Sequence, residues 1–134
     1  MILQSSVDMH VFAIIVLFII ILVNFYLVLN EKEFISLSKK LKIMTPLFHL
    51  CNAIVFYTGA IVAAHLQKMN PSIILMIIMT ILLMILEIKR YKKMRIIKSS
   101  EISLQTEFRF FTKKIYTSQI IAIILTILIA FILN

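Results

Sequence analysis

The sequence predicts an all-α protein, a bundle of four transmembrane helices with up-down topology and both termini outside. Hydrophobic residues make up 62% and charged residues 15% of the 134-residue chain, against about 45–50% and about 25% in soluble domains. A small soluble domain cannot bury such a surplus, because much of its surface stays exposed. The apolar residues gather in four stretches that can each cross a bilayer. The whole chain, residues 1–134, is therefore expected to be one integral membrane domain.

The first span is predicted at about residues 9–29, near the ~20 residues that a helix needs to cross ~30 Å of hydrocarbon. Residues 1–8 lack a positive n-region, and the apolar run that follows is too long for the core of a signal peptide, so a retained span is expected. In residues 30–44, apolar side chains recur at helical spacing between lysines. This pattern predicts a short segment that lies in the membrane interface.

The second span is predicted at about residues 45–67, and it contains His49, Asn52 and His65. Residues 68–71 read KMNP and predict a tight turn, because Asn-Pro breaks a helix. The third span, about residues 72–88, is an almost unbroken run of Ile, Leu and Met.

Residues 89–115 form the most basic segment of the chain. Ser99 and Ser100 precede Glu101, an arrangement that predicts a helix start. A cytoplasmic helix is expected to lead from there into the fourth span, at about residues 116–133.

The distribution of Lys and Arg predicts the orientation. Of fourteen such residues, four lie in segment 30–44 and nine in segment 89–115. Short basic loops stay in the cytoplasm, so these two loops are expected there, with both termini and the KMNP turn outside. Basic residues beside spans also attract anionic lipids. The expected partners are therefore the bilayer and anionic lipids at its cytoplasmic face, and the net charge of +8 requires no nucleic acid.

Each predicted span carries a stripe of polar or small residues at about 100° per residue. On the second span the stripe predicts a packing face, with Gly59 and Ala63 as a small-xxx-small pair, while Cys51, Thr58 and His65 fall on the opposite side. The stripes are His10, Ala13, Leu17, Ile21 and Asn24; His49, Asn52, Ala53, Phe56, Gly59, Ala60 and Ala63; Met76, Thr80, Leu83 and Glu87; and Gln119, Ala122, Thr126 and Ala130. All four are expected to face inward.

Alternating directions bring Asn24, His49, Asn52, Glu87 and Gln119 toward the cytoplasmic end, and His10 and His65 toward the outer end. An ionisable group inside a span costs ~2.5–3.5 kcal/mol on insertion scales and tends to be paired or functional. A His49–Glu87 pair is therefore predicted inside the bundle. The alternatives are that Glu87 ends its helix in the headgroups, that His49 makes an interhelical hydrogen bond, and that Asn52 joins two helices.

Catalysis of the soluble type has no support in the sequence. The single cysteine, Cys51, excludes an internal disulfide and a CxxC redox or zinc site. The sequence contains no Gly-rich phosphate loop, no HExxH motif and no Ser/His/Asp arrangement. No metal site is predicted, and an enzyme is the less favoured class.

The second span resembles that of SirB-type membrane proteins, in which a His-x-x-Asp precedes an apolar run that ends at glycine. Here His49 and Asn52 match that motif, with Asn in place of Asp, and Gly59 follows ten residues after the histidine. The resemblance extends to four spans with a histidine near the start of the first, His10, and to a basic stretch after the third. The resemblance implies a small inner-membrane protein of bacteria and carries no activity with it. A ligand, haem or proton site is expected instead from the inward positions of His49, Asn52 and Glu87, with His10 as a further candidate cofactor residue.

More distantly, the chain resembles the HemJ and CopD-like bundles, which are associated with porphyrin oxidation or copper. This likeness implies a protoporphyrinogen oxidase as an alternative function. Two others remain open: a transporter subunit, which would need a homo-oligomer because four spans enclose little volume, and an accessory subunit of a membrane complex.

Overall fold

The described part of the chain, residues 2–67, 70–98 and 100–133 of a computed structural model, consists of four long α-helices and short connections. These are α1 (Ile2–Asn30), α2 (Phe34–Leu66), α3 (Pro71–Arg95) and α4 (Ile102–Leu133). All four are long and apolar enough to cross a membrane. The predicted all-α bundle of four such helices is confirmed.

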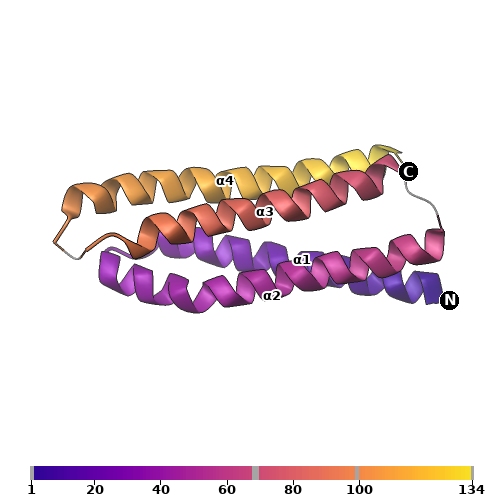
Figure 1. Cartoon of the computed structure of the whole chain (residues 1–134), viewed down its shortest axis with the longest axis horizontal. Helices are drawn as coiled ribbons and strands as arrows, with labels where there is room; N and C mark the ends of the chain where they lie inside the picture. The colour runs from indigo at the N-terminus through magenta and orange to yellow at the C-terminus, as the bar shows by residue number, and fades with distance from the viewer. Residues whose placement is uncertain (1, 68–69, 99, 134) are drawn as a thin grey trace.

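The helices lie side by side and run alternately in opposite directions, so that α1 and α4 have their free ends at the same end of the bundle (Figure 1). α1 packs against α2 and α4, and α3 packs against the same two helices, which closes the four into a ring. The shortest helix has 25 residues and the longest 33. At 1.5 Å per residue these lengths are about 38 and 50 Å, more than the ~30 Å of a hydrocarbon core.

Local capping explains where α3 begins. The Asn70 side chain accepts a hydrogen bond from the Ile73 N–H at 3.0 Å, and Pro71 occupies the first turn, where its missing N–H costs nothing. Gln67 ends α2 in the left-handed conformation, with its N–H donated to the Ala63 carbonyl. The predicted KMNP turn lies partly outside the described residues, at 68–69.

The segment predicted to lie in the interface, residues 30–44, does not form a separate helix. From Phe34 onward it is the first part of α2, which continues without a break through Pro46. Its apolar residues Phe34, Leu37 and Leu41 are buried in the bundle core. They therefore extend the core beyond the predicted span. At the same end α3 continues to Arg95, and α4 begins at Ile102, directly after the predicted start signal, of which Ser99 lies outside the described residues.

The inward stripes predicted on the first and fourth spans are confirmed. Their members are buried at steps of three and four residues: His10, Ala13, Leu17, Ile21 and Asn24 on α1, and Gln119, Ala122, Thr126 and Ala130 on α4. On α3, Leu83 and Glu87 are buried, whereas Met76 and Thr80 are half-buried. This spacing is that of helices that pack at a shallow angle.

The predicted packing face of the second span is wrong in its rotation. Ala53, Phe56 and Ala60 are exposed, and His49, Gly59 and Ala63 are half-buried. The buried stripe is instead Thr45, Phe48, Asn52, Val55 and Thr58, which continues the spacing of Phe34, Leu37 and Leu41. Large side chains bury more apolar area than small ones, and Phe48 and Val55 therefore set the rotation of α2.

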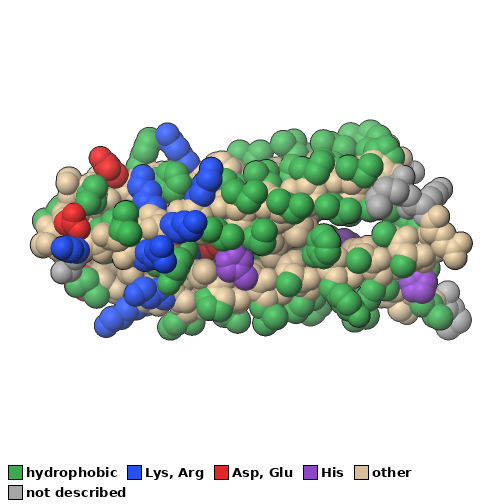
Figure 2. Space-filling model, viewed as in Figure 1, with side chains coloured by type: hydrophobic (Ala, Val, Ile, Leu, Met, Phe, Trp, Pro, Cys, Tyr) green, Lys and Arg blue, Asp and Glu red, His purple; other side chains and the backbone are tan. Residues whose placement is uncertain are grey.

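The outer surface is largely hydrophobic along most of the bundle, and Lys and Arg side chains gather in a band toward the end opposite the termini (Figure 2). Exposed apolar side chains include Phe12, Tyr57, Phe131 and Ile132, each more than 60% exposed. An apolar surface of this extent is suited to lipid rather than to water.

Candidate functional site

The deepest charges in the bundle are two neighbours on α3, Glu87 and Arg90. Arg90 Nη2 lies 2.9 Å and Arg90 Nε 3.0 Å from Glu87 Oε1, and both side chains are 0% exposed. Their spacing of three residues places them on one face of the helix. A buried ion pair must recover the cost of its own desolvation through further hydrogen bonds.

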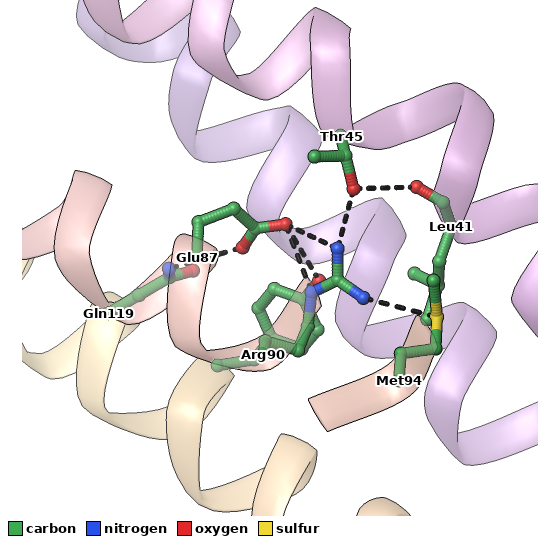
Figure 3. Close-up of polar contacts among 7 residues, drawn as sticks. Leu41, Thr45, Glu87, Arg90, Met94 and Gln119 are labelled. Carbon is green, nitrogen blue, oxygen red and sulfur yellow. Dashed lines mark hydrogen bonds and ion pairs between the residues drawn. The ribbon is translucent and has the colours of Figure 1, made fainter. Parts of the chain in front are cut away.

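Arg90 also connects α3 to α2. Its Nη2 donates to Thr45 Oγ1 at 2.5 Å, and Thr45 in turn donates to the Leu41 carbonyl at 2.8 Å (Figure 3). Its Nη1 has only a weak acceptor, Met94 Sδ, at 3.5 Å. The Nε and Nη2 groups of the guanidinium therefore have oxygen acceptors, whereas its Nη1 group has only the weak sulfur acceptor.

Glu87 connects α3 to α4. The Tyr116 hydroxyl donates to Oε1 and Gln119 Nε2 donates to Oε2, each at a distance of 3.4 Å. The Tyr116 ring lies 6.0 Å from Arg90 Cζ, within the range of a cation–π contact. Three helices thus converge on the pair, but both bonds from α4 are longer than the usual hydrogen-bond distance.

Several polar atoms at this depth lack a hydrogen-bond partner among the described residues. They are Asn24 Nδ2, Asn24 Oδ1, Thr112 Oγ1 and Gln119 Oε1, all in side chains that are 0% exposed. Buried polar groups in native proteins are almost always hydrogen-bonded. Four unpartnered atoms in three residues therefore need an explanation.

Two contacts fix the register that brings these atoms to the ion pair. Arg109 on α4 donates to the carbonyls of Val28 at 3.2 Å and Lys32 at 2.8 Å. One turn farther into the bundle, Asn24 on α1 and Thr112 on α4 are therefore level.

At the other end, His10 contacts Thr58 on α2. Asn24 lies fourteen residues after His10, and fourteen residues before Thr58 is residue 44, next to Thr45. We call this set the polar layer: Asn24, Thr45, Glu87, Arg90, Thr112, Tyr116 and Gln119.

The predicted His49–Glu87 pair is not formed, because the carboxylate is paired with Arg90. Arg90 reaches Glu87 from one turn along the same helix, whereas His49 is rotated away from the buried stripe of α2. His49 instead lines a groove between α2 and α3 with a volume of about 320 Å³, together with Asn52, Ala53, Phe56, Thr80, Ile81 and Met84. Glu87 does not end its helix, since α3 continues to Arg95.

Asn52 joins two helices, as one of its alternatives predicted. Its Nδ2 donates to the Thr80 carbonyl on α3 at 3.2 Å, and its Oδ1 has no partner among the described residues. The side chain is 4% exposed.

His10 is buried near the other end of the bundle. Its Nδ1 lies 2.9 Å from Thr58 Oγ1, whose hydroxyl has the Ile54 carbonyl within 2.8 Å as its own acceptor. This places the proton on Nδ1 and leaves Nε2 as an acceptor, for which the described residues offer no partner. Gly59, the single glycine, lies against the ring: a Cβ there would stand 3.0 Å from His10 Cε1.

The three candidate cofactor residues do not form one site. His10 is level with Thr58, nine residues from His49, or about 13 Å along the helix axis. His65 is exposed. In the described ranges no group of three or more His, Cys, Asp or Glu side chains is arranged to hold a metal ion.

Comparison with protein-family models, with curated proteins and with solved structures finds no match. The site therefore rests on its own geometry. Sequence reasoning found three members of the polar layer, Glu87, Asn24 and Gln119. It missed the other four, Arg90, Thr45, Thr112 and Tyr116. The signal for Arg90 was its spacing of three residues from Glu87, which placed both on one helix face.

Proposed function

We propose that this chain is a small multi-pass protein of the bacterial inner membrane that exchanges protons at Glu87 inside its helix bundle. The observation that carries the proposal is the Glu87–Arg90 pair, fully buried between four helices that are each apolar enough to cross a membrane. Ionisable residues within membrane spans are costly to insert and mark functional sites by default.

The incomplete hydrogen bonding of the polar layer favours exchange over a purely structural role. A structural ion pair is stabilising only when its remaining donors and acceptors are satisfied. Here Tyr116 and Gln119 reach Glu87 over 3.4 Å, and Arg90 Nη1 has a sulfur as its acceptor. On the side of α4 the carboxylate is therefore held only by long hydrogen bonds, and this is the side from which a proton would reach it.

The band of basic side chains supports an orientation with segments 30–44 and 89–115 in the cytoplasm and both termini outside. Lys93 and Lys114 lie 4.4 Å from the rings of Phe111 and Phe110. Basic and aromatic side chains together suit the headgroup region, where anionic lipids are the expected partners. The polar layer then lies near the cytoplasmic headgroups.

The resemblance to SirB-type proteins names neither an activity nor a substrate. The haem and protoporphyrinogen-oxidase alternatives gain no support from the histidines, because His10 and His49 lie about 13 Å apart along the helix axis. A second candidate is an accessory subunit of a membrane complex, or of a homo-oligomer. The groove between α2 and α3 favours it, because it brings the polar side chain of His49 to the lateral surface of the bundle.

The test is proton flux in proteoliposomes that contain a trapped pH-sensitive dye and are driven by a potassium diffusion potential. Flux above that of protein-free vesicles is expected for the natural chain, with its loss in Glu87→Gln. Glu107→Gln, the same change at an exposed position of α4, is the matched control and should retain the flux. Equal flux in all three proteins would exclude the proposal, and co-purification of other membrane proteins would then favour the accessory role.

A further inference from the structure

The unpartnered atoms of the polar layer are a mixed set of hydrogen-bonding groups. Asn24 contributes a donor and an acceptor, Thr112 a hydroxyl and Gln119 an acceptor, and Arg90 Nη1 carries a proton beyond the one directed at Met94 Sδ. Leaving such groups unsatisfied is unfavourable, because each loses its hydrogen bonds to water without replacement. A water molecule both donates and accepts, and buried waters typically make about three hydrogen bonds to groups of this kind.

The polar layer is closed toward the end of the bundle that carries the band of Lys and Arg, opposite the termini. An apolar plug fills the core there, with every member at most 8% exposed: Val28, Phe34, Leu37, Leu41, Met94 and Phe108. Phe34 and Phe108 meet edge to face at 5.7 Å between ring centres. Among the described residues, no buried polar side chain interrupts this plug, which therefore closes the bundle axis to water and protons from this end.

The groove between α2 and α3 reaches within one helical turn of the layer. On α3 its wall includes Met84, one turn before Glu87, and on α2 it includes His49, one turn after Thr45. His49 is half-buried, so its ring is in contact with both the groove and the surroundings. Figure 2 shows a histidine side chain at the surface beside the band of Lys and Arg.

We propose that Asn24, Thr112 and Gln119 hold ordered water against the Glu87–Arg90 pair, and that this water exchanges protons with the α2–α3 groove through His49. This inference rests on the proposed function and names the route to its site. Imidazole suits the role because it takes up and releases protons near neutral pH.

The groups that face Glu87 are accounted for on every helix. They are Arg90 on α3 and Tyr116 and Gln119 on α4. On α2, His49 lines the groove rather than the layer. α1 contributes only the uncharged Asn24 to this level. His49 is therefore the imidazole that lies both at the groove and in contact with the surroundings.

Water-edited solid-state NMR of ¹⁵N-labelled protein in lipid bilayers tests the water directly. Magnetisation should pass from water to the side-chain amides of Asn24 and Gln119 faster than to the backbone of the core residue Leu17. Transfer to these amides as slow as to Leu17 would overturn the inference. The measurement needs no substitution, so a variant that fails to fold does not affect it.

His49→Phe tests the route, with His65→Phe as the matched control at an exposed position. The first variant should slow both the water transfer and the proton flux several-fold, and the second should change neither. Unchanged flux in a folded His49→Phe protein would overturn the route.

The two experiments distinguish a failure of this inference from a failure of the proposed function. A polar layer without water, together with proton flux that still depends on Glu87, would contradict the inferred water and support the proposed function. A polar layer that holds water, together with proton flux that Glu87→Gln does not change, would contradict the proposed function and support the inferred water.

Discussion

Arg90 lies one turn beyond Glu87 on α3, and its Nη2 stands 2.9 Å from Glu87 Oε1 with both side chains excluded from solvent. The pair is local in sequence, yet it holds the bundle together, because Arg90 bonds Thr45 on α2 and Glu87 accepts from Tyr116 and Gln119 on α4. Its energetic role can be tested apart from its function.

Arg90→Met should lower the free energy of unfolding by about 3–5 kcal/mol, because it leaves the Glu87 carboxylate buried without its partner. The double variant Glu87→Met/Arg90→Met should recover most of that loss, since it removes both buried charges. Reversible unfolding in mixed micelles, followed by circular dichroism, measures both. Additive losses in the double variant would show that the two side chains are not energetically coupled.

Gly59→Ala should destabilise the bundle by about 1–3 kcal/mol, because its methyl group would stand 3.0 Å from His10 Cε1 and displace the ring from Thr58. In a His10→Ala background the same substitution should become stabilising by up to about 1 kcal/mol, since alanine favours helix over glycine. The same unfolding assay reports both values. A loss of equal size in the two backgrounds would contradict the contact.

Arg109→Ala should loosen the end of α1, because its guanidinium donates to the carbonyls of Val28 and Lys32. We expect a loss of about 1 kcal/mol and faster amide exchange at the end of α1 and in the connection to α2. Hydrogen–deuterium exchange with mass spectrometry resolves that region. Lys113→Ala, an exposed cation on the same helix, serves as the control and should leave the exchange unchanged.

Glu31, between α1 and α2, should titrate below its ordinary range. The Lys40 ammonium donates to it at 2.7 Å, and this hydrogen bond, with a further one from Ser36, lowers the pKa of the carboxyl. A lowered folded-state pKa contributes stability that is present above the unfolded value of 4.5 and is lost as the pH falls through the folded value.

A carbon-detected NMR titration of Glu31 measures this pKa. Lys40→Gln should raise it toward the ordinary value, whereas Lys39→Gln should have little effect. Because the pair is exposed, added salt should weaken the shift in the natural chain. A Glu31 pKa that is the same in all three proteins would contradict the interaction.

Much of this architecture is local information. Composition and the lengths of the apolar runs predict four helices, and spacing at three and four residues predicts the inward stripes of α1 and α4 correctly down to Asn24 and Gln119. These features depend on the solvent that each stretch prefers and on the helical repeat, both of which are properties of a segment taken alone.

The rotation of α2 and the partner of Glu87 depend instead on neighbouring helices. Small residues indicated a face through Ala53 and Ala60, but the large side chains of Phe48 and Val55 bury more area and turn that face outward. His49 moves with it into a groove, while Arg90, whose exposed neighbours Lys89 and Lys92 suggest a surface position, is turned inward to Glu87 and Thr45. A buried charge is stabilised by whichever partners the packed helices bring within reach, and only the assembled bundle brings Arg90, Tyr116 and Gln119 together around Glu87.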